Sequence, residues 1–165
     1  MLKQKYKVDI RWHAYELRPP GSPPPDPKFI QYLESTARPR FNQMMRDQYG
    51  IEPTPGAFGI STRLPLIGEK AAHALYGRDT ADAYHEAVTR AYWTEAKDIS
   101  DPAVLRAIAE KLDMDGEKFS AALNDPAYAR EVMIDEYQAQ QMGLQGVPAL
   151  IFANKYYISG AQPLE

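Results

Sequence analysis

The feature that most constrains the fold is an apolar stretch near the C-terminal end with a proline as its second residue. Residues 147–152 read Val-Pro-Ala-Leu-Ile-Phe, and residues 156–158 read Tyr-Tyr-Ile after a polar break. Two short apolar runs around a polar turn predict a β-hairpin, and we expect it to be buried. Proline is tolerated at the first residue of a strand, and Pro148 is a candidate for a cis peptide bond in a tight turn.

A second strand is predicted near the N-terminus. Tyr6, Val8, Ile10 and Trp12 alternate with charged or polar residues. Period two over this length is typical of a strand with one buried face, and we expect that strand over residues 6–17. The following ten residues contain six prolines, which prevent regular pairing and favour an exposed connecting loop.

Between the two strand regions, every periodic signal in residues 29–142 is helical, and residues 51–59, with two prolines and two glycines, are predicted to form a loop. A first helical region is expected over residues 29–49, with a break before Pro39 because the residue preceding a proline disfavours helical geometry. A second helix is expected over residues 66–76, where Gly77 provides a stop.

Two later helices are predicted by one repeated pattern, a carboxylate followed by a proline, at Asp101 and Asp125. The carboxylate can cap the helix, and proline fits its first turn. A helical block of this length between strands predicts an α/β chain (α+β by content) with a small sheet and a large helical insert. We expect one domain, with residues 1–20 and 146–165 forming the sheet part and residues 28–143 forming the insert.

Composition narrows the possible chemistry. The chain has 165 residues, a net charge of −3 and no cysteine. The absence of cysteine excludes disulfides, thiolate–metal sites and thiol catalysis by these residues alone. The charge gives no reason to expect nucleic acid or an anionic membrane as a partner. The three histidines lack a ligand spacing, and no nucleotide-binding motif occurs, so we expect neither a metal nor a cofactor.

No apolar run approaches the roughly 18 residues that a membrane span needs. The N-terminus has charge but no apolar core after it, which is unlike a secretory signal. We therefore expect a cytoplasmic protein.

The C-terminal motif resembles that of a known family. Gly146, Val147 and Pro148, followed by an apolar strand and Lys-Tyr-Tyr-Ile-Ser-Gly-Ala-Gln-Pro over residues 155–163, resemble the DsbA-like thioredoxin-fold proteins. The pattern is most similar to the FrnE-type branch of cytoplasmic dithiol–disulfide oxidoreductases. The resemblance implies a thioredoxin-like sheet with a large inserted helical subdomain.

Further similarity extends along the chain. Residues 61–64, Ser-Thr-Arg-Leu, are similar to an Asn-Thr-Arg-Leu segment near the family's active site, with serine in place of asparagine. Residues 91–95 and 98–101 resemble the family's Ala-Tyr-Phe and Asp-Ile-Ser-Asp motifs. In this family a strand and a helix bearing Cys-x-x-Cys precede the strand expected here, so the resemblance implies a chain that lacks this unit and is incomplete at both ends.

The resemblance also implies roles for particular residues. Val147 and Pro148 would contact the backbone of an extended thiol or disulfide substrate, and Gly146 would permit its close approach. Three polar residues are possible members of the groove beside this loop: His13, Ser61 and Arg63. Without the family's first strand, the sheet would have exposed edges, and we expect a homodimer or strand exchange to cover them.

Two other functions fit the same residues. Relatives on the glutathione-dependent isomerase or kappa-transferase side of the superfamily use serine in place of the first cysteine, so a lack of cysteine does not exclude them. A redox-inactive scaffold could also bind extended peptides at the same loop by adding a strand to the sheet.

Overall fold

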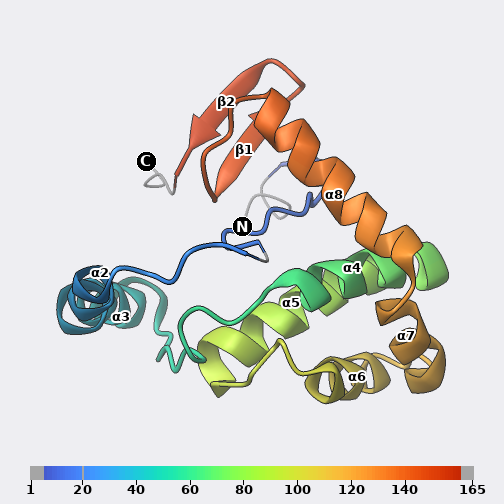
Figure 1. The fold of residues 1–165 in the computed structure, drawn as a ribbon, viewed down its shortest axis with the longest axis horizontal. Helices are drawn as coiled ribbons and strands as arrows, with labels where there is room; N and C mark the ends of the chain where they lie inside the picture. The colour runs from blue at the N-terminus through green and yellow to red at the C-terminus, as the bar shows by residue number, and fades with distance from the viewer. Residues whose placement is uncertain (1–5, 20, 161–165) are drawn as a thin grey trace.

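The computed structural model describes residues 6–19 and 21–160 (Figure 1). Their secondary structure is mostly helical, with one small sheet at the C-terminal end. In order, the elements are α2 (Pro27–Tyr32), η1 (Leu33–Ala37), α3 (Arg38–Tyr49), α4 (Arg63–Tyr76), α5 (Arg78–Glu95), α6 (Pro102–Lys111), α7 (Gly116–Leu123), α8 (Pro126–Gln141), β1 (Ala149–Phe152) and β2 (Tyr156–Ser159). In this part of the chain, no helix is long and apolar enough to cross a membrane.

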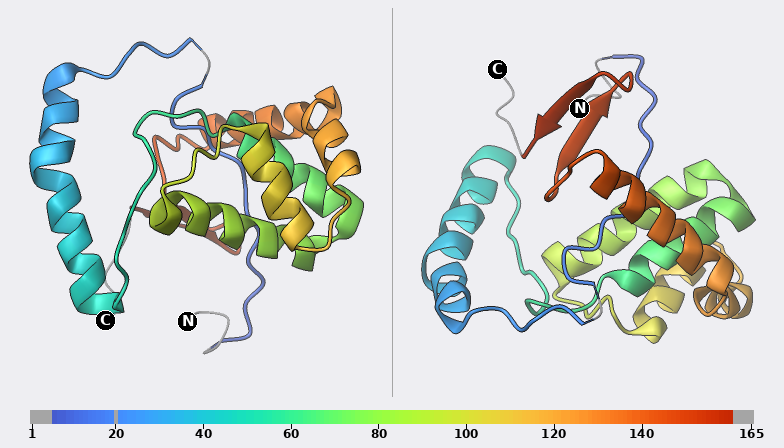
Figure 2. Two further views of the ribbon diagram at one scale, coloured as in Figure 1. Left: turned by 90° about the horizontal axis from the view of Figure 1, so that it is seen from below. Right: turned by 45° about the horizontal axis from the view of Figure 1, so that its top comes forward.

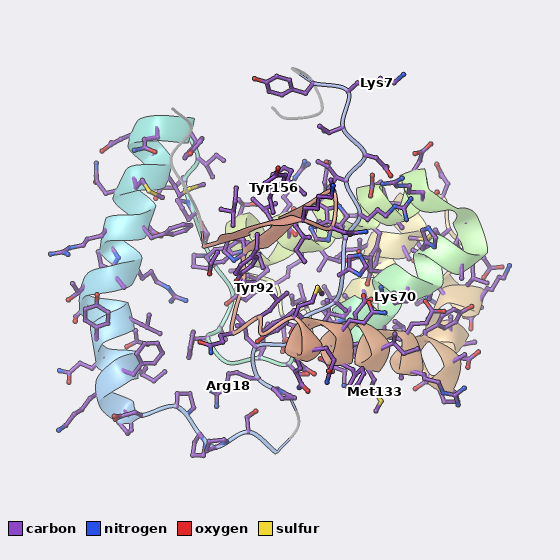
Figure 3. All side chains as sticks on the ribbon, turned by 90° about the horizontal axis from the view of Figure 1, so that it is seen from above. Lys7, Arg18, Lys70, Tyr92, Met133 and Tyr156 are labelled. Atoms are coloured by element: carbon purple, nitrogen blue, oxygen red, sulfur yellow. The ribbon has the colours of Figure 1, made fainter. Side chains whose placement is uncertain are left out.

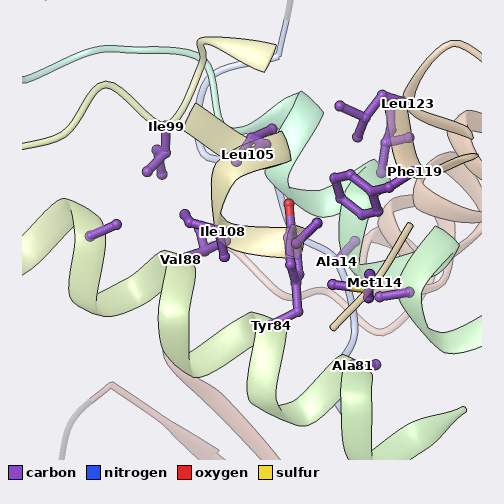
Figure 4. Close-up of a cluster of buried hydrophobic side chains, with 14 of the residues drawn as sticks. Ala14, Ala81, Tyr84, Val88, Ile99, Leu105, Ile108, Met114, Phe119 and Leu123 are labelled. Atoms are coloured by element: carbon purple, nitrogen blue, oxygen red, sulfur yellow. The ribbon is translucent and has the colours of Figure 1, made fainter. Parts of the chain in front are cut away.

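The core lies among helices α4 to α8. Its largest fully buried side chains are Tyr84, Leu105, Phe119 and Val132, one each from α5, α6, α7 and α8. Figure 4 shows Tyr84 reaching from α5 toward Phe119, and their ring centroids are 5.3 Å apart. Gly68 of α4 lies so close to Tyr84 that an added Cβ would be 2.3 Å from the tyrosine hydroxyl. The helices therefore meet at this point with no space for a larger residue.

The two predicted carboxylate caps are confirmed. Asp101 accepts a hydrogen bond from the backbone N–H of Ala103 at 2.8 Å, and Asp125 does the same for Ala127 at 2.8 Å. Each is followed by a proline in the first turn of its helix. These local interactions fix where α6 and α8 begin.

The expected break before Pro39 is wrong, because α2, η1 and α3 follow one another without interruption. Proline lacks an N–H and collides with the carbonyl four residues back in a regular α-helix. Here the preceding turn is a π-helix, in which the Arg38 N–H bonds to the Leu33 carbonyl, and this wider turn accommodates the proline. The resulting helical arm has no buried residue and stands apart from the other helices in Figure 2.

The C-terminal hairpin is confirmed, with β1 and β2 antiparallel and Leu150 opposite Ile158. The expectation that it is buried is wrong, since Leu150 is 42% exposed and Tyr156 is 69% exposed. The reason is that the sheet has only two strands in the described part of the chain, so no third strand and no extensive helical layer covers them.

The expected strand over residues 6–17 is also wrong, because the structure assigns no strand there. Val8 and Trp12, predicted to face the core, are 39% and 47% exposed. A strand needs a neighbouring strand to complete its hydrogen bonds, and none lies beside this segment among the described residues. Residues 1–5, 20 and 161–165 of the predicted sheet part, including the end of the Ser-Gly-Ala-Gln-Pro motif, lie outside the described residues.

Candidate functional site

The loop that enters β1 contains the three residues predicted to bind substrate. It follows the end of α8, where Gly143 adopts a positive φ of 69°. The Val147–Pro148 peptide bond is cis, and the Val147 side chain is 49% exposed. The Pro148 carbonyl accepts a hydrogen bond from the Gly160 N–H at 2.9 Å, which ties the loop to the end of β2.

Gly146 is half-buried, yet no atom of the described residues lies within 4 Å of the position of an added Cβ. Contacts among the described residues therefore do not require glycine at this position. The space at this Cβ position lies directly beside the exposed Val147.

A buried carboxylate anchors His13 and the N-terminal segment to the helices. Asp135 of α8 bonds to His13 Nδ1 at 3.0 Å and to the Ala14 backbone N–H at 2.7 Å. It also accepts a hydrogen bond from Lys70 Nζ of α4, and Figure 3 shows Lys70 between the N-terminal segment and α8. Burial raises the pKa of Asp135, but the bonds from Lys70, Ala14 and His13 outweigh burial and hold that pKa below its ordinary value.

Ser61 and Arg63 lie at a second buried carboxylate, that of Glu16. The Glu16 side chain has no exposed surface; its Oε1 accepts a hydrogen bond from Ser61 Oγ at 3.2 Å, and its Oε2 lies 3.5 Å from Arg63 Nη1. Within the described part of the chain, Glu16 Oε2 is buried without a hydrogen-bond partner. The structure thus brings Ser61 and Arg63 together, and the short segment from His13 to Glu16 links them to the Asp135 cluster.

Sequence reasoning did not identify Asp135, Lys70 or Glu16. Asp135 is 121 residues from Ala14 in the sequence, and Ser61 is 45 residues from Glu16. The only sequence signal was the position of Asp135 on the apolar side of its helix, three residues after the buried Val132. A charged side chain on the buried side of a helix is most often paired with a group of opposite charge.

A cavity of about 450 Å³ lies beside His13. Its lining combines aromatic and charged groups of both signs, including Trp12, His13, Lys70, His73, Arg78 and Glu131. Trp12 also stacks on His85 with ring centroids 4.1 Å apart. Neither Ser61 nor Arg63 lines this cavity. Among residues 6–19 and 21–160, no three histidine or carboxylate side chains converge in a way that could hold a metal ion.

The residues of this loop and of the clusters beside it supply no thiol. An exposed valine, a cis proline and an open glycine lie at the entrance to a two-stranded sheet, beside a helical block. These features are those expected of a thioredoxin-like fold with inserted helices.

The comparison with protein families agrees with this class. Residues 1–165 match the family described as the DSBA-like thioredoxin domain, and the chain belongs to this family.

Individual relatives are distant. The chain is 24% identical over 161 residues to YwbO, an uncharacterized protein of Bacillus subtilis (strain 168), and the match covers 89% of this chain and 73% of YwbO. A probable DsbA oxidoreductase from Streptomyces coelicolor has a similar structure, with a TM-score of 0.68, 24% identity and coverage of 92% of this chain and 68% of that one. The cytosolic disulfide reductase DsbM from Pseudomonas aeruginosa has a TM-score of 0.51 and 21% identity, covering 81% of this chain and 65% of DsbM. At these identities the two solved structures show a shared fold.

Proposed function

We propose that this chain is the substrate-holding part of a DsbA-type disulfide oxidoreductase of the FrnE-type branch. In this proposal the loop of Gly146, Val147 and Pro148 holds the backbone of an extended thiol- or disulfide-containing protein or small molecule. The reactive dithiol comes from residues that are not among these 165, because no cysteine occurs in them. Thiol–disulfide exchange requires an attacking thiolate and a mixed disulfide, which this polypeptide alone cannot form.

The observation that carries the proposal is the exposed cis-proline loop at the entrance to β1. Val147 is 49% exposed although valine is usually buried, and no atom of the described residues lies within 4 Å of an added Cβ at Gly146. An extended peptide beside this loop can add main-chain hydrogen bonds to those of the sheet, as in other strand-addition complexes.

Polar residues of the segment beside the loop are proposed to border the same groove. His13 bonds to Asp135, whereas Ser61 and Arg63 contact Glu16, three residues further along the same segment.

The proposal also covers the oligomeric state, the partners and the location of the protein. We propose a cytoplasmic homodimer that binds neither nucleic acid nor membranes, for which the net charge of −3 gives no electrostatic attraction. The cytosolic location of DsbM, which shares the fold, supports this placement.

A second candidate function is a redox-inactive protein that binds extended peptides at the same loop. The cysteine-free sequence favours it, since binding requires no thiol. The two candidates differ only in whether a dithiol reacts with the ligand while it is bound.

Fluorescence anisotropy with a labelled extended peptide tests the binding step. We expect a peptide with a central cysteine and its serine analogue to bind equally, because the chain has no thiol to form a mixed disulfide. Val147→Lys should weaken both about tenfold, as expected when one apolar contact of about 1.4 kcal/mol is lost. Met133→Lys is the matched control, since Met133 is 56% exposed on the outer side of α8 (Figure 3). Unchanged affinity in Val147→Lys would reject this loop as the binding site.

A second assay separates the two candidate functions. A Cys-x-x-Cys peptide is mixed with a disulfide-containing peptide, and their exchange is followed with and without this chain. The oxidoreductase proposal expects faster exchange when the chain holds both the disulfide substrate and the Cys-x-x-Cys peptide, because holding the two reactants together raises their effective concentration. An unchanged rate with retained binding would favour the redox-inactive alternative.

A further inference from the structure

A second cavity, of about 250 Å³, lies along α6. It is lined by residues of α6 and of the loop between α5 and α6: Lys97, Ala103, Val104, Ala107, Ile108 and Lys111. None of the described residues of the N-terminal segment, β1 or β2 lines it. In Figure 1, α6 lies on the opposite side of α4 and α5 from the hairpin. The cavity is therefore formed without any contribution from the edges of the sheet.

The floor of this cavity is one face of α6. Ala103, Ala107 and Lys111 follow one another at intervals of four residues, and such residues lie on the same face of a helix. Val104 and Ile108 lie beside them with the same spacing. Ile108 is only 6% exposed, whereas both alanines are exposed. Because alanine is short, the outer side of the helix is hollow at these two positions, and the floor of the hollow is apolar.

Two ammonium groups border the apolar floor. Lys97 Nζ lies 2.6 Å from Glu95 Oε2, and Lys111 forms no ion pair with any described residue. The hydrogen bond from Lys97, together with the attraction of Lys111 and Arg90, outweighs burial and holds the pKa of Glu95 below its ordinary value. One carboxylate of the described chain is thus shared by three cations.

The acidic residues just before α6 bind other groups. Asp98 accepts hydrogen bonds from the N–H and the hydroxyl of Ser100, and Asp101 accepts one from the Ala103 N–H. Neither acid lines the cavity. Among the residues that the structure describes, the two lysines are therefore the only charged groups in the lining.

We propose that this cavity binds a short-chain aliphatic carboxylate, with its chain on the floor formed by residues 103–108 and its carboxylate between Lys97 and Lys111. The size of the ligand follows from the volume. A water molecule takes about 30 Å³ in the liquid, so 250 Å³ accommodates roughly eight non-hydrogen atoms. Hexanoate has this size. The site is separate from the loop at Val147, and the inference goes beyond the proposed function.

The charge and the polarity of the lining select this class of ligand. A neutral apolar molecule would cover the floor but leave both ammonium groups without a partner, and an organic cation would be repelled by them. An inorganic anion would make no use of the apolar floor. Lysine stems can cover apolar surface while their ammonium groups stay in water. A carboxylate at the mouth of the cavity is therefore paired without being fully desolvated.

A nitrogen-15 NMR titration of the 165-residue chain with sodium hexanoate tests the site. We expect saturable chemical-shift changes at the amides of Lys97 and α6, with millimolar affinity because so small a ligand makes few contacts. Hexanol should bind about threefold more weakly, since it lacks the ion pairs. Acetate and hexylamine should give no saturable change at α6. Added sodium chloride should weaken the binding of hexanoate and leave that of hexanol unchanged.

Two variants test the two parts of the site. Lys111→Gln should weaken hexanoate binding about threefold and leave hexanol binding unchanged. Lys28→Gln is the matched control, because Lys28 is exposed on α2 and does not line the cavity. Ala107→Leu should abolish the binding of both ligands, since the larger side chain fills the hollow. Circular dichroism checks that its helices are kept, which is expected because leucine favours helix.

Three results would overturn the inference. They are no saturable change at α6 with hexanoate, equal affinities for hexanoate and hexanol, and an unchanged hexanoate affinity in Lys111→Gln. The peptide-binding assay keeps the site separate from the proposed function, because Lys111→Gln should bind the labelled peptide like the wild type. Peptide binding without hexanoate binding would overturn only this inference. Hexanoate binding without peptide binding would support it and reject the substrate-holding function.

Discussion

Replacement of Asp135 by asparagine is expected to lower the free energy of unfolding by about 2–3 kcal/mol. The amide can still accept the hydrogen bond from the Ala14 N–H, but Lys70, which is only 16% exposed, loses its counter-charge. A hydrogen bond to a charged group contributes about 1.5–3 kcal/mol net. The pair with His13, whose side chain is 63% exposed, adds at most about 1 kcal/mol because solvent screens it.

The effect should depend on pH. The folded pKa of Asp135 lies below its ordinary value, because the hydrogen bonds outweigh the opposing effect of burial. Such a group stabilises the fold above its unfolded pKa, about 3.9, and loses that contribution as the pH falls through the folded value. The difference between wild type and Asp135→Asn should therefore be complete near neutral pH and shrink below about pH 4.

Urea unfolding at neutral and acidic pH measures this difference. Glu131→Gln is the matched control, since it removes one negative charge from an exposed position of the same helix. Lys70→Met combined with Asp135→Asn should cost less than the sum of the single changes, because it removes both charges together. A loss below about 0.5 kcal/mol, the usual range of surface substitutions, would refute the role of Asp135 as an anchor. An equal loss of unfolding free energy near neutral pH and below about pH 4 would refute the electrostatic cause.

Further predictions concern the core and the helix caps, and all can be checked by urea or thermal unfolding. Tyr84→Phe should leave stability unchanged or raise it by about 1 kcal/mol, because the buried hydroxyl has no hydrogen-bond partner among the described residues; a clear loss of stability would show that the hydroxyl does have one. Gly68→Ala should destabilise by about 1–3 kcal/mol despite alanine's better helix propensity, since the added Cβ meets Tyr84, and a gain would contradict this packing. Asp101→Ala and Asp125→Ala should each cost about 1 kcal/mol, and no loss would show that the prolines alone set the helix starts.

Features determined by neighbouring residues could be predicted from the sequence. The caps at Asp101 and Asp125 act on backbone groups two residues away, and the hairpin depends on two apolar runs around a short turn. The π-helical turn before Pro39 was not predicted. A proline can either break a helix or be accommodated by a wider turn, and the local sequence does not distinguish these two outcomes.

Features that depend on distant partners could not be predicted. The alternation of Val8 and Trp12 predicts a strand that the structure does not have, because a strand also needs a neighbour, which the pattern cannot supply. The exposure of the hairpin has the same origin. The same difference applies to the candidate site. The loop at Val147 was predicted from a local motif, whereas the Asp135 and Glu16 clusters were not, because they join residues far apart in the chain.

The most direct test of the substrate-holding function is a nitrogen-15 NMR titration of the chain with the extended peptide. Pro148 has no amide proton, so we expect the largest chemical-shift changes at the amides of Gly146, Val147 and β1. Smaller shifts are expected at Ser61 and Arg63, and none at Met133 on the outer side of α8. Shifts confined to the helical arm, or saturable binding with no change near Val147, would contradict the account.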